Sequence, residues 1–464
     1  MLTGPRSLVA AGKAWYKAGA NTGTRNRMNR SFYTIMAAQF FSSLADNALL
    51  IAAIAQLLEL DGPAWMVPLL KFFFTVSYVV LAAFVGAFAD AIPKGRVMFI
   101  TNTIKIVGCV MMFFTDYVEF AGIPGYVLVL AAYAVVGFGA AAYSPAKYGI
   151  LTELLPAEKL VAANGWIEGL TVASIILGTV LGGALISPRI ASMLLAIDVP
   201  HIDTGVETPA EAAIMVISCL YIIAAVFNLF IPDTGARYGK QQTNPALLMR
   251  DFYLCLSMLW KDRLGQISLA VTTLFWGAGA TLQFLVLQWG AVHLGLPLDK
   301  SAVLQGITAV GVALGAVIAG RFITLKRALD VLPAGVVMGV VVMLMIFVSS
   351  MPIVYALLVI IGMMAGFFVV PMNALLQHRG YVLLSAGHSI AVQNFNENIS
   401  ILVMLAIYSA MIKASLHINI IIIAFGAFVV VTMFGVMVRH RYNQAKGDLT
   451  HLIGMKTDPQ RGFP

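Results

Sequence analysis

Apolar stretches of about twenty residues recur along almost the whole chain, separated by short polar connections. A helix needs about 20 apolar residues to cross a bilayer, so each stretch is long enough to form one transmembrane helix. We predict spans at 31–58, 66–89, 97–115, 125–146, 159–186, 212–231, 265–293, 302–322, 331–350, 352–373, 385–412 and 418–438. The pattern therefore indicates an all-α integral membrane protein with twelve transmembrane helices.

Composition and charge agree with this pattern. Hydrophobic residues make up 60% of the chain and charged residues 11%, whereas soluble domains contain about 25% charged residues. Basic residues gather in the N-terminal segment, in every second connection and in the C-terminal tail, which predicts that both termini are cytoplasmic. The net charge of +8 then reflects topology and attraction to anionic membrane lipid, with no need for nucleic acid. No cleavable signal peptide is apparent, and the first span is expected to serve as the insertion signal.

A polar stretch divides the predicted spans into six and six. We expect an N-terminal six-helix half at 31–231, a cytoplasmic connection at 232–263 and a C-terminal six-helix half at 264–438. A basic cytoplasmic segment, 1–30, precedes them, and a cytoplasmic tail, 439–464, follows them. Transporters built from two similar halves have this layout.

Polar residues interrupt several of the spans. Asp46 and Asn47 lie near the middle of the first span, about 22 Å of helical rise from its start. An acid at that depth is costly, so it should face a pathway or a partner inside the protein. Lys105 in the third span is a second intramembrane charge, and it could neutralise a buried acid within the fold.

The two halves also repeat an amide and a glutamate four residues apart, which places both on one helix face. In the N-terminal half these are Asn164 and Glu168, and in the C-terminal half Gln393 and Glu397. We expect a role in transport for each glutamate, and the alternative for each is an interhelical hydrogen bond that serves the fold.

The loop after the second span resembles the signature loop of the major facilitator superfamily. The matching residues are Gly86-Ala-Phe-Ala-Asp90 and Lys94-Gly95-Arg96. The Gly95-Arg96 pair comes two residues later than the corresponding pair of the usual signature, so the loop is longer here. The resemblance implies alternating access between the two halves, with Asp90 and Arg96 in gating roles.

A closer resemblance is to the bacterial lysophospholipid transporter family. It rests on blocks in both halves: Asp46-Asn47-Ala48-Leu49-Leu50, Ala142-Tyr143-Ser144-Pro145-Ala146-Lys147-Tyr148-Gly149, Leu274-Phe275-Trp276-Gly277, Gly366-Phe367-Phe368-Val369-Val370-Pro371-Met372-Asn373, and Gln393-Asn394-Phe395-Asn396-Glu397. It implies a protein of the bacterial cytoplasmic (inner) membrane that moves lysophospholipids, such as lysophosphatidylethanolamine, from the outer to the inner leaflet. A separate acyltransferase would then restore the missing acyl chain.

For the substrate that this resemblance implies, Asp46, Glu168 and Glu397 are candidate ligands of an ammonium or of glycerol hydroxyls, and Lys105 is a candidate ligand of the phosphate. The resemblance adds two further positions to the expected substrate site. Lys147, in the Ser-Pro-Ala-Lys block, is a candidate head-group ligand, although topology alone would also place a lysine there. Gln283 follows Thr-Leu in the seventh span, where relatives often carry a basic residue. If that charge holds phosphate in relatives, another cation must hold it here.

Other chemistries find little support in the sequence. Cys109, Cys219 and Cys255 have no metal-ligand spacing, and we assign no cofactor or metal. No histidine is followed by an acid five residues later, as a lipid acyltransferase would require, and no Gly-rich phosphate loop appears, so we expect no enzyme and no ATP-driven pump. A proton-coupled exporter of amphipathic drugs, in which a buried acid titrates, is the alternative, and a receptor or scaffold is a weaker one.

Overall fold

The computed structural model describes residues 22–63, 66–120, 122–196, 206–239, 241, 243–296, 298–447 and 453, so part of the predicted N-terminal segment and most of the tail after 447 lie outside the described residues. Within them every regular element is a helix, and eleven helical segments, or twelve with one bent pair, are long and apolar enough to cross a membrane. The prediction of an all-α protein with twelve spans is confirmed.

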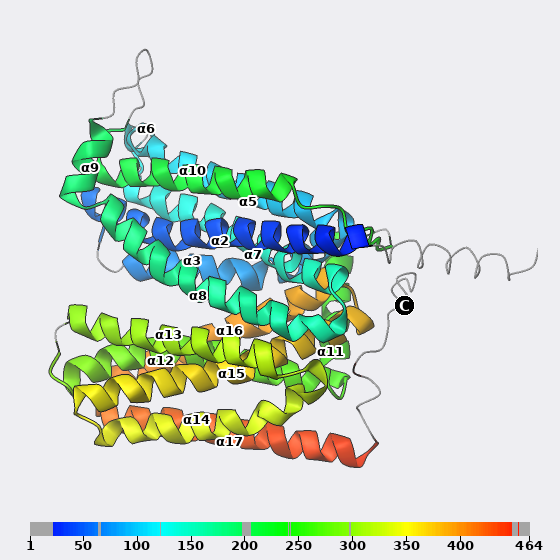
Figure 1. Cartoon of the computed structure of the whole chain (residues 1–464). Helices are drawn as coiled ribbons and strands as arrows, with labels where there is room; N and C mark the ends of the chain where they lie inside the picture. Colours follow the sequence, from blue (N-terminus) through cyan, green and yellow to red (C-terminus); the bar gives the residue numbers. More distant parts are fainter. Residues whose placement is uncertain are drawn as a thin grey trace, which may run out of the picture.

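Two groups of six spans lie side by side (Figure 1). The first contains α2 (Thr22–Glu59), α3 (Val67–Val80) with α4 (Ala82–Ala91), α5 (Lys94–Met111), α7 (Gly125–Leu154), α8 (Leu160–Leu185) and α10 (Pro209–Leu229). The second contains α12 (Gly265–Val292), α13 (Leu298–Phe322), α14 (Leu332–Met343), α15 (Met351–Leu383), α16 (Ala386–Lys413) and α17 (Ile418–Ala445). Short helices α6 (Thr115–Phe120) and α9 (Pro188–Leu195) extend the connections of the first group.

The second span is broken, where the sequence suggested one continuous helix over 66–89. α3 and α4 meet at Leu81 with a bend of 66°. The bend brings α4 against the start of α16, where a Cβ on Gly86 would lie 3.0 Å from the Cα of His388. The lack of a side chain at Gly86 therefore permits a close contact between the two halves.

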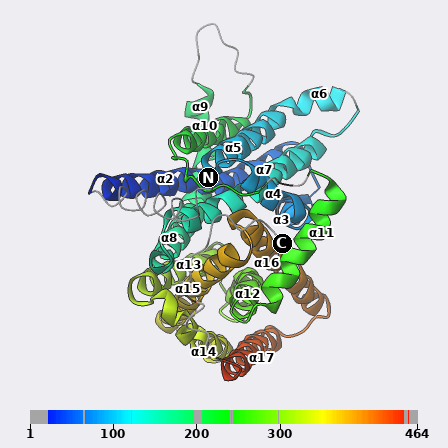
Figure 2. The same ribbon diagram turned by 90° about the vertical axis from the view of Figure 1, so that its right-hand side faces the viewer.

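The connection between the halves contains a helix, α11 (Pro245–Lys261), that the sequence analysis treated only as a polar stretch. Asn244 caps its first turn through a 3.0 Å hydrogen bond from the Ala246 N–H, and proline occupies its first position. Phe252, Cys255 and Leu259 form its buried face, and burial raises the pKa of the Cys255 thiol to about 12. Figure 2 shows α11 lying across one end of the molecule beside α12 and α16.

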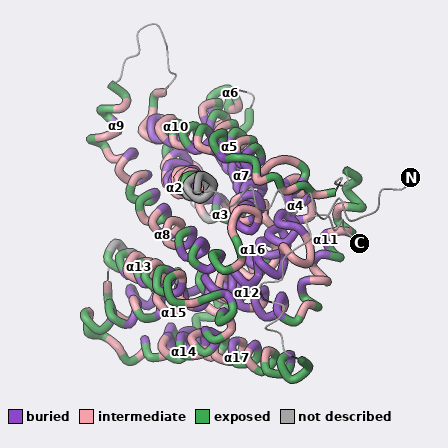
Figure 3. Tube along the Cα trace, turned by 45° about the vertical axis from the view of Figure 1, so that its right-hand side comes forward, coloured by how far each residue is buried: buried purple, intermediate pink, exposed green. Residues whose placement is uncertain are grey.

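Small residues let the helices of the second half pack closely. A Cβ added at Gly315 of α13 would overlap the carbonyl oxygen of Met363, and one at Gly366 of α15 would overlap that of Val312. Such contacts between helix backbones are typical of membrane proteins. Buried positions form bands along the inward faces of the helices in both halves (Figure 3).

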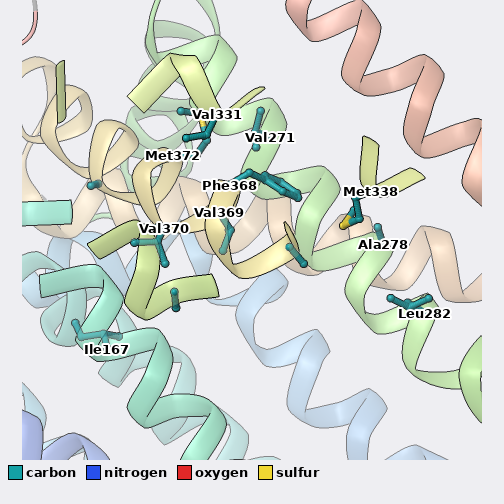
Figure 4. Close-up of a cluster of buried hydrophobic side chains, with 14 of the residues drawn as sticks. Ile167, Val271, Ala278, Leu282, Val331, Met338, Phe368, Val369, Val370 and Met372 are labelled. Atoms are coloured by element: carbon teal, nitrogen blue, oxygen red, sulfur yellow. The ribbon is translucent and has the colours of Figure 1, made fainter. Parts of the chain in front are cut away.

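The core of the second half also receives a side chain from the first. Phe368, Val369 and Val370 of α15 lie in a cluster that includes Val271 and Ile167, the last of these from α8 (Figure 4). The interface between the halves is therefore partly apolar. Its polar contacts lie on the same helices, and they define the candidate site.

Candidate functional site: a polar pathway between the two halves

Asp46 is held by a buried lysine in the first half. The Nζ of Lys105 lies 2.8 Å and 2.9 Å from the two carboxylate oxygens of Asp46 and donates a third hydrogen bond, 3.1 Å, to Ser42. The hydroxyl of Tyr221 donates a 2.7 Å hydrogen bond to Asp46. The rings of Tyr221 and Tyr143 lie 5.5 Å and 5.1 Å from the Lys105 ammonium.

The two partners differ in their access to water. The Lys105 side chain is 1% exposed, whereas that of Asp46 is 20% exposed. Lys105 was expected either to bind phosphate or to neutralise a buried acid, and in this structure its charge neutralises Asp46. Asp46 is the member of the pair that a solute can reach in this conformation.

The amide and glutamate of α8 both contact α15. Asn164 and Gln377 exchange two hydrogen bonds, of 2.8 Å and 2.9 Å. One turn further along each helix, the Nδ2 of Asn373 donates a 3.3 Å hydrogen bond to Glu168. Asn164 and Glu168 thus share a face, as their spacing predicts, and this face meets the other half of the protein.

The second amide and glutamate bond to each other. The Nε2 of Gln393 donates hydrogen bonds of 2.7 Å to Glu397 and 3.1 Å to the side-chain oxygen of Asn373. Since Asn373 also contacts Glu168, a continuous chain of side chains joins the two glutamates across the interface. Both glutamates are buried. In these contacts each glutamate accepts its hydrogen bond from a neutral amide and not from a cation.

Three other expected site residues lie apart from these hydrogen-bonded groups. Lys147 is half-buried, with its ammonium 4.8 Å from the Tyr148 ring, and it is within electrostatic range of Glu168. Asn47 donates a 2.8 Å hydrogen bond to the carbonyl of Ser43 on its own helix. Gln283 is exposed, and its backbone carbonyl oxygen accepts a 2.7 Å hydrogen bond from the side-chain amide of Gln305 on α13.

Asp90 joins the two halves at the end of the molecule where α11 lies. Its carboxylate accepts hydrogen bonds from the backbone N–H groups of Gly387, at 2.9 Å, and His388, at 3.3 Å, in the first turn of α16. The Ser385 hydroxyl and the His388 ring also contact it. An acid at a helix N-terminus satisfies N–H groups that have no partner within the helix.

Lys94 is the basic partner of Asp90, and Arg96, which was expected to share a gating role with Asp90, is not in this ion pair. Lys94 Nζ lies 2.7 Å from Asp90 and 3.4 Å from Glu153, and its side chain is 2% exposed. The Arg96 side chain is exposed to the surface. Lys94 begins α5 four residues after Asp90, so the longer loop places this lysine beside the acid.

Further polar contacts at this end have no counterpart in the sequence analysis. Glu153 accepts hydrogen bonds from Thr234, at 2.6 Å, and Tyr238, at 2.7 Å, in the connection between the halves. Burial, together with the Glu153 charge, raises the pKa of the Tyr238 hydroxyl. Arg379 forms a two-point contact with Asp262 at the end of α11, at 3.1 Å and 2.6 Å.

These contacts close one end of the interface. In the described part of the chain, the hydrogen bonds that directly join helices of the two halves come from Asp90, Ser144, Asn164 and Glu168 and their partners. All four lie in the portions of their helices nearest to α11. The conformation is therefore closed at the α11 end, and Asp46 lies on the other side of this closure.

The fold and this interface define a transporter class, and comparison with known proteins agrees. The family model of the Major Facilitator Superfamily matches residues 35–403, and the chain belongs to that superfamily. It is 42% identical over 387 residues to the lysophospholipid transporter LplT of Yersinia pestis, covering 83% of this chain and 88% of that protein. LplT of Yersinia pseudotuberculosis matches with the same identity and coverage.

Solved structures share the fold at low sequence identity. The transporter FucP in its outward conformation has a TM-score of 0.65 and 14% identity, covering 89% of this chain and 99% of that one. A bacterial homologue of the iron transporter ferroportin in an outward-facing state has a TM-score of 0.66 and 14% identity, with the same coverage. The similarity of these two structures shows the common fold.

Proposed function

We propose that this protein moves lysophospholipids across the bacterial cytoplasmic membrane. The observation that carries the proposal is the 42% identity to LplT over 83% of the chain. The buried polar interface supports it, because a lysophospholipid head group carries a phosphate anion and, in some cases, an ammonium. A carrier for it needs charges of both signs within the membrane.

We infer that transport runs from the outer to the inner leaflet by alternating access between the two halves. Both termini and α11 then lie in the cytoplasm, as the distribution of basic residues favours. The head group would pass along Asp46, Glu168 and Glu397 while the acyl chain stays near the lipid. A separate acyltransferase on the cytoplasmic side would use the delivered lysophospholipid.

The first test is movement of fluorescent lysophosphatidylethanolamine in proteoliposomes that contain the purified protein, with and without a pH gradient. We expect transfer that does not depend on the gradient. No transfer of any one-chain phospholipid by folded protein would refute the proposal.

A variant tests the part that Glu397 plays in head-group recognition. We expect Glu397→Gln to reduce transport of lysophosphatidylethanolamine by about tenfold, the value of one charge-assisted hydrogen bond, and to reduce lysophosphatidylglycerol transport less. Glu158→Gln, at an exposed position outside the interface, is the matched control. Equal losses for both lipids would contradict recognition of the ammonium.

A proton-coupled exporter is the second candidate, and the surroundings of Glu397 are the observation that favours it. Its carboxylate is buried and accepts a hydrogen bond from a neutral amide, an arrangement that also suits a proton carrier. This function predicts gradient-dependent efflux of unrelated amphipathic cations, which the same vesicles can measure.

A further inference from the structure

Lys71 lies on the inward face of α3. Residues of an α-helix that are nine positions apart point in opposite directions, since each residue turns the helix by about 100°. Val80, nine residues after Lys71, is 63% exposed, and Phe73, about 200° from Lys71, is exposed on the same side of α3. Lys71 is nevertheless exposed as well, so its side chain reaches open space on the opposite side.

The neighbours of Lys71 on this face identify that space. Thr75 and Tyr78 follow at i+4 and i+7, which places both within about 40° of Lys71 around the helix. Thr75 is buried, and Tyr78 is within electrostatic range of both Asp46 and Glu397, one from each half. Lys71 is also within electrostatic range of Asp46. This face of α3 therefore borders the space between the halves.

The ammonium of Lys71 is available to a ligand. In the described part of the chain it has no carboxylate within 4.0 Å, and it lies 5.8 Å from the centre of the Phe74 ring. Lys105, by contrast, is 1% exposed and bonded to Asp46. Gln283 supplies no charge at all.

Lys71 and Lys147 lie at different depths. Lys71 is about 6 Å of helical rise from the start of α3, at the end of the molecule opposite α11. Lys147 is about 33 Å from the start of α7, which begins at that same end. The two lysines therefore lie on opposite sides of Asp46 along the pathway.

We propose that Lys71 is the entry ligand for the phosphate group of the transported lysophospholipid. This inference rests on the proposed function and adds a residue to it. The phosphodiester of a head group that enters at the end opposite α11 meets the Lys71 ammonium first, and an ammonium carried by the same head group can then reach the exposed part of Asp46. Lysine binds phosphate as a point charge and needs no fixed orientation.

The test compares Lys71→Gln and Lys71→Arg in proteoliposomes, with lysophosphatidylglycerol and monoacylglycerol, which has no phosphate, as the two probes. We expect Lys71→Gln to raise the lysophosphatidylglycerol concentration that half-saturates transport about tenfold or more, and to leave any binding of monoacylglycerol unchanged. Lys71→Arg keeps the charge and should restore most of the loss. Lys300→Gln removes an exposed lysine at the start of α13 and is the matched control.

Two results would overturn the inference. One is a Lys71→Gln protein whose half-saturating lysophosphatidylglycerol concentration is unchanged. The other is an equal loss of affinity for both probes, which would indicate a structural role. Failure of the proposed function is distinguishable, because the wild-type protein would then move neither lysophosphatidylglycerol nor lysophosphatidylethanolamine.

Discussion

The two partners of the Asp46–Lys105 ion pair should contribute unequally to stability. Removing one member of a buried pair costs about 3–5 kcal/mol, because the remaining charge is left without compensation. Asp46→Asn leaves Lys105 as a 1% exposed ammonium, with Ser42 and the neutral amide as its hydrogen-bond acceptors. We expect that variant to lose about 3–5 kcal/mol of unfolding free energy.

The opposite variant should be milder. In Lys105→Gln, Asp46 keeps the hydrogen bond from Tyr221 and the 20% exposure that lets water solvate it. We expect a loss of about 1–3 kcal/mol, the cost of a partly satisfied buried group. The double variant contains no buried charge at this position, and should be more stable than Asp46→Asn alone by about 1–3 kcal/mol.

Unfolding by dodecyl sulfate in mixed micelles, followed through the fluorescence of the 6 tryptophans, measures these differences. Asp233→Asn is the control, since it breaks an exposed pair with Arg237 and should change stability by less than about 1 kcal/mol. The reasoning is refuted if Lys105→Gln destabilises the protein more than Asp46→Asn does, or if the two losses simply add in the double variant.

Two further predictions concern the closed end and the helix packing. Asp90→Asn should increase the rate of hydrogen exchange at the Gly387 N–H about tenfold or more, because the charge that holds the first turn of α16 is lost. Asp233→Asn should leave the exchange rate there unchanged. Equal exchange rates in both variants would contradict a closing role for Asp90. Gly366→Ala should lower the free energy of unfolding by about 1–3 kcal/mol, because the added Cβ overlaps the backbone of α13. Gly306→Ala, where nothing lies within 4 Å of the added Cβ, should be neutral or slightly stabilising. Similar thermal stability of the two variants would count against close packing at Gly366.

The spans were predictable because hydrocarbon length and apolar composition determine them directly, and the prediction of twelve is confirmed. The bend at Leu81 was not predictable, since neither glycine nor proline occupies that position and the contact of α4 with α16 that accompanies the bend joins residues far apart in the sequence. α11 was also missed. Its buried residues are interspersed with charged and exposed ones, so a search for long apolar windows passes over an amphipathic surface helix.

The candidate site was predictable in its residue types and not in its pairings. A carboxylate at mid-bilayer depth requires a partner, but the choice of Lys105 depends on which helices are neighbours, and only the tertiary structure determines that. The repeat of an amide and a glutamate suggested equivalent pairs in the two halves. Gln393 bonds to Glu397, whereas Asn164 bonds to Gln377, because α8 faces a helix with its own amides.

The reciprocal contact between Asn164 and Gln377 has a consequence for the opening of the α11 end. Both groups are uncharged amides, and water supplies the same donors and acceptors at nearly the same free energy. Hydration of the separated surfaces therefore replaces this contact at a cost of about 1 kcal/mol, and thermal motion is sufficient to separate these two amides and rejoin them.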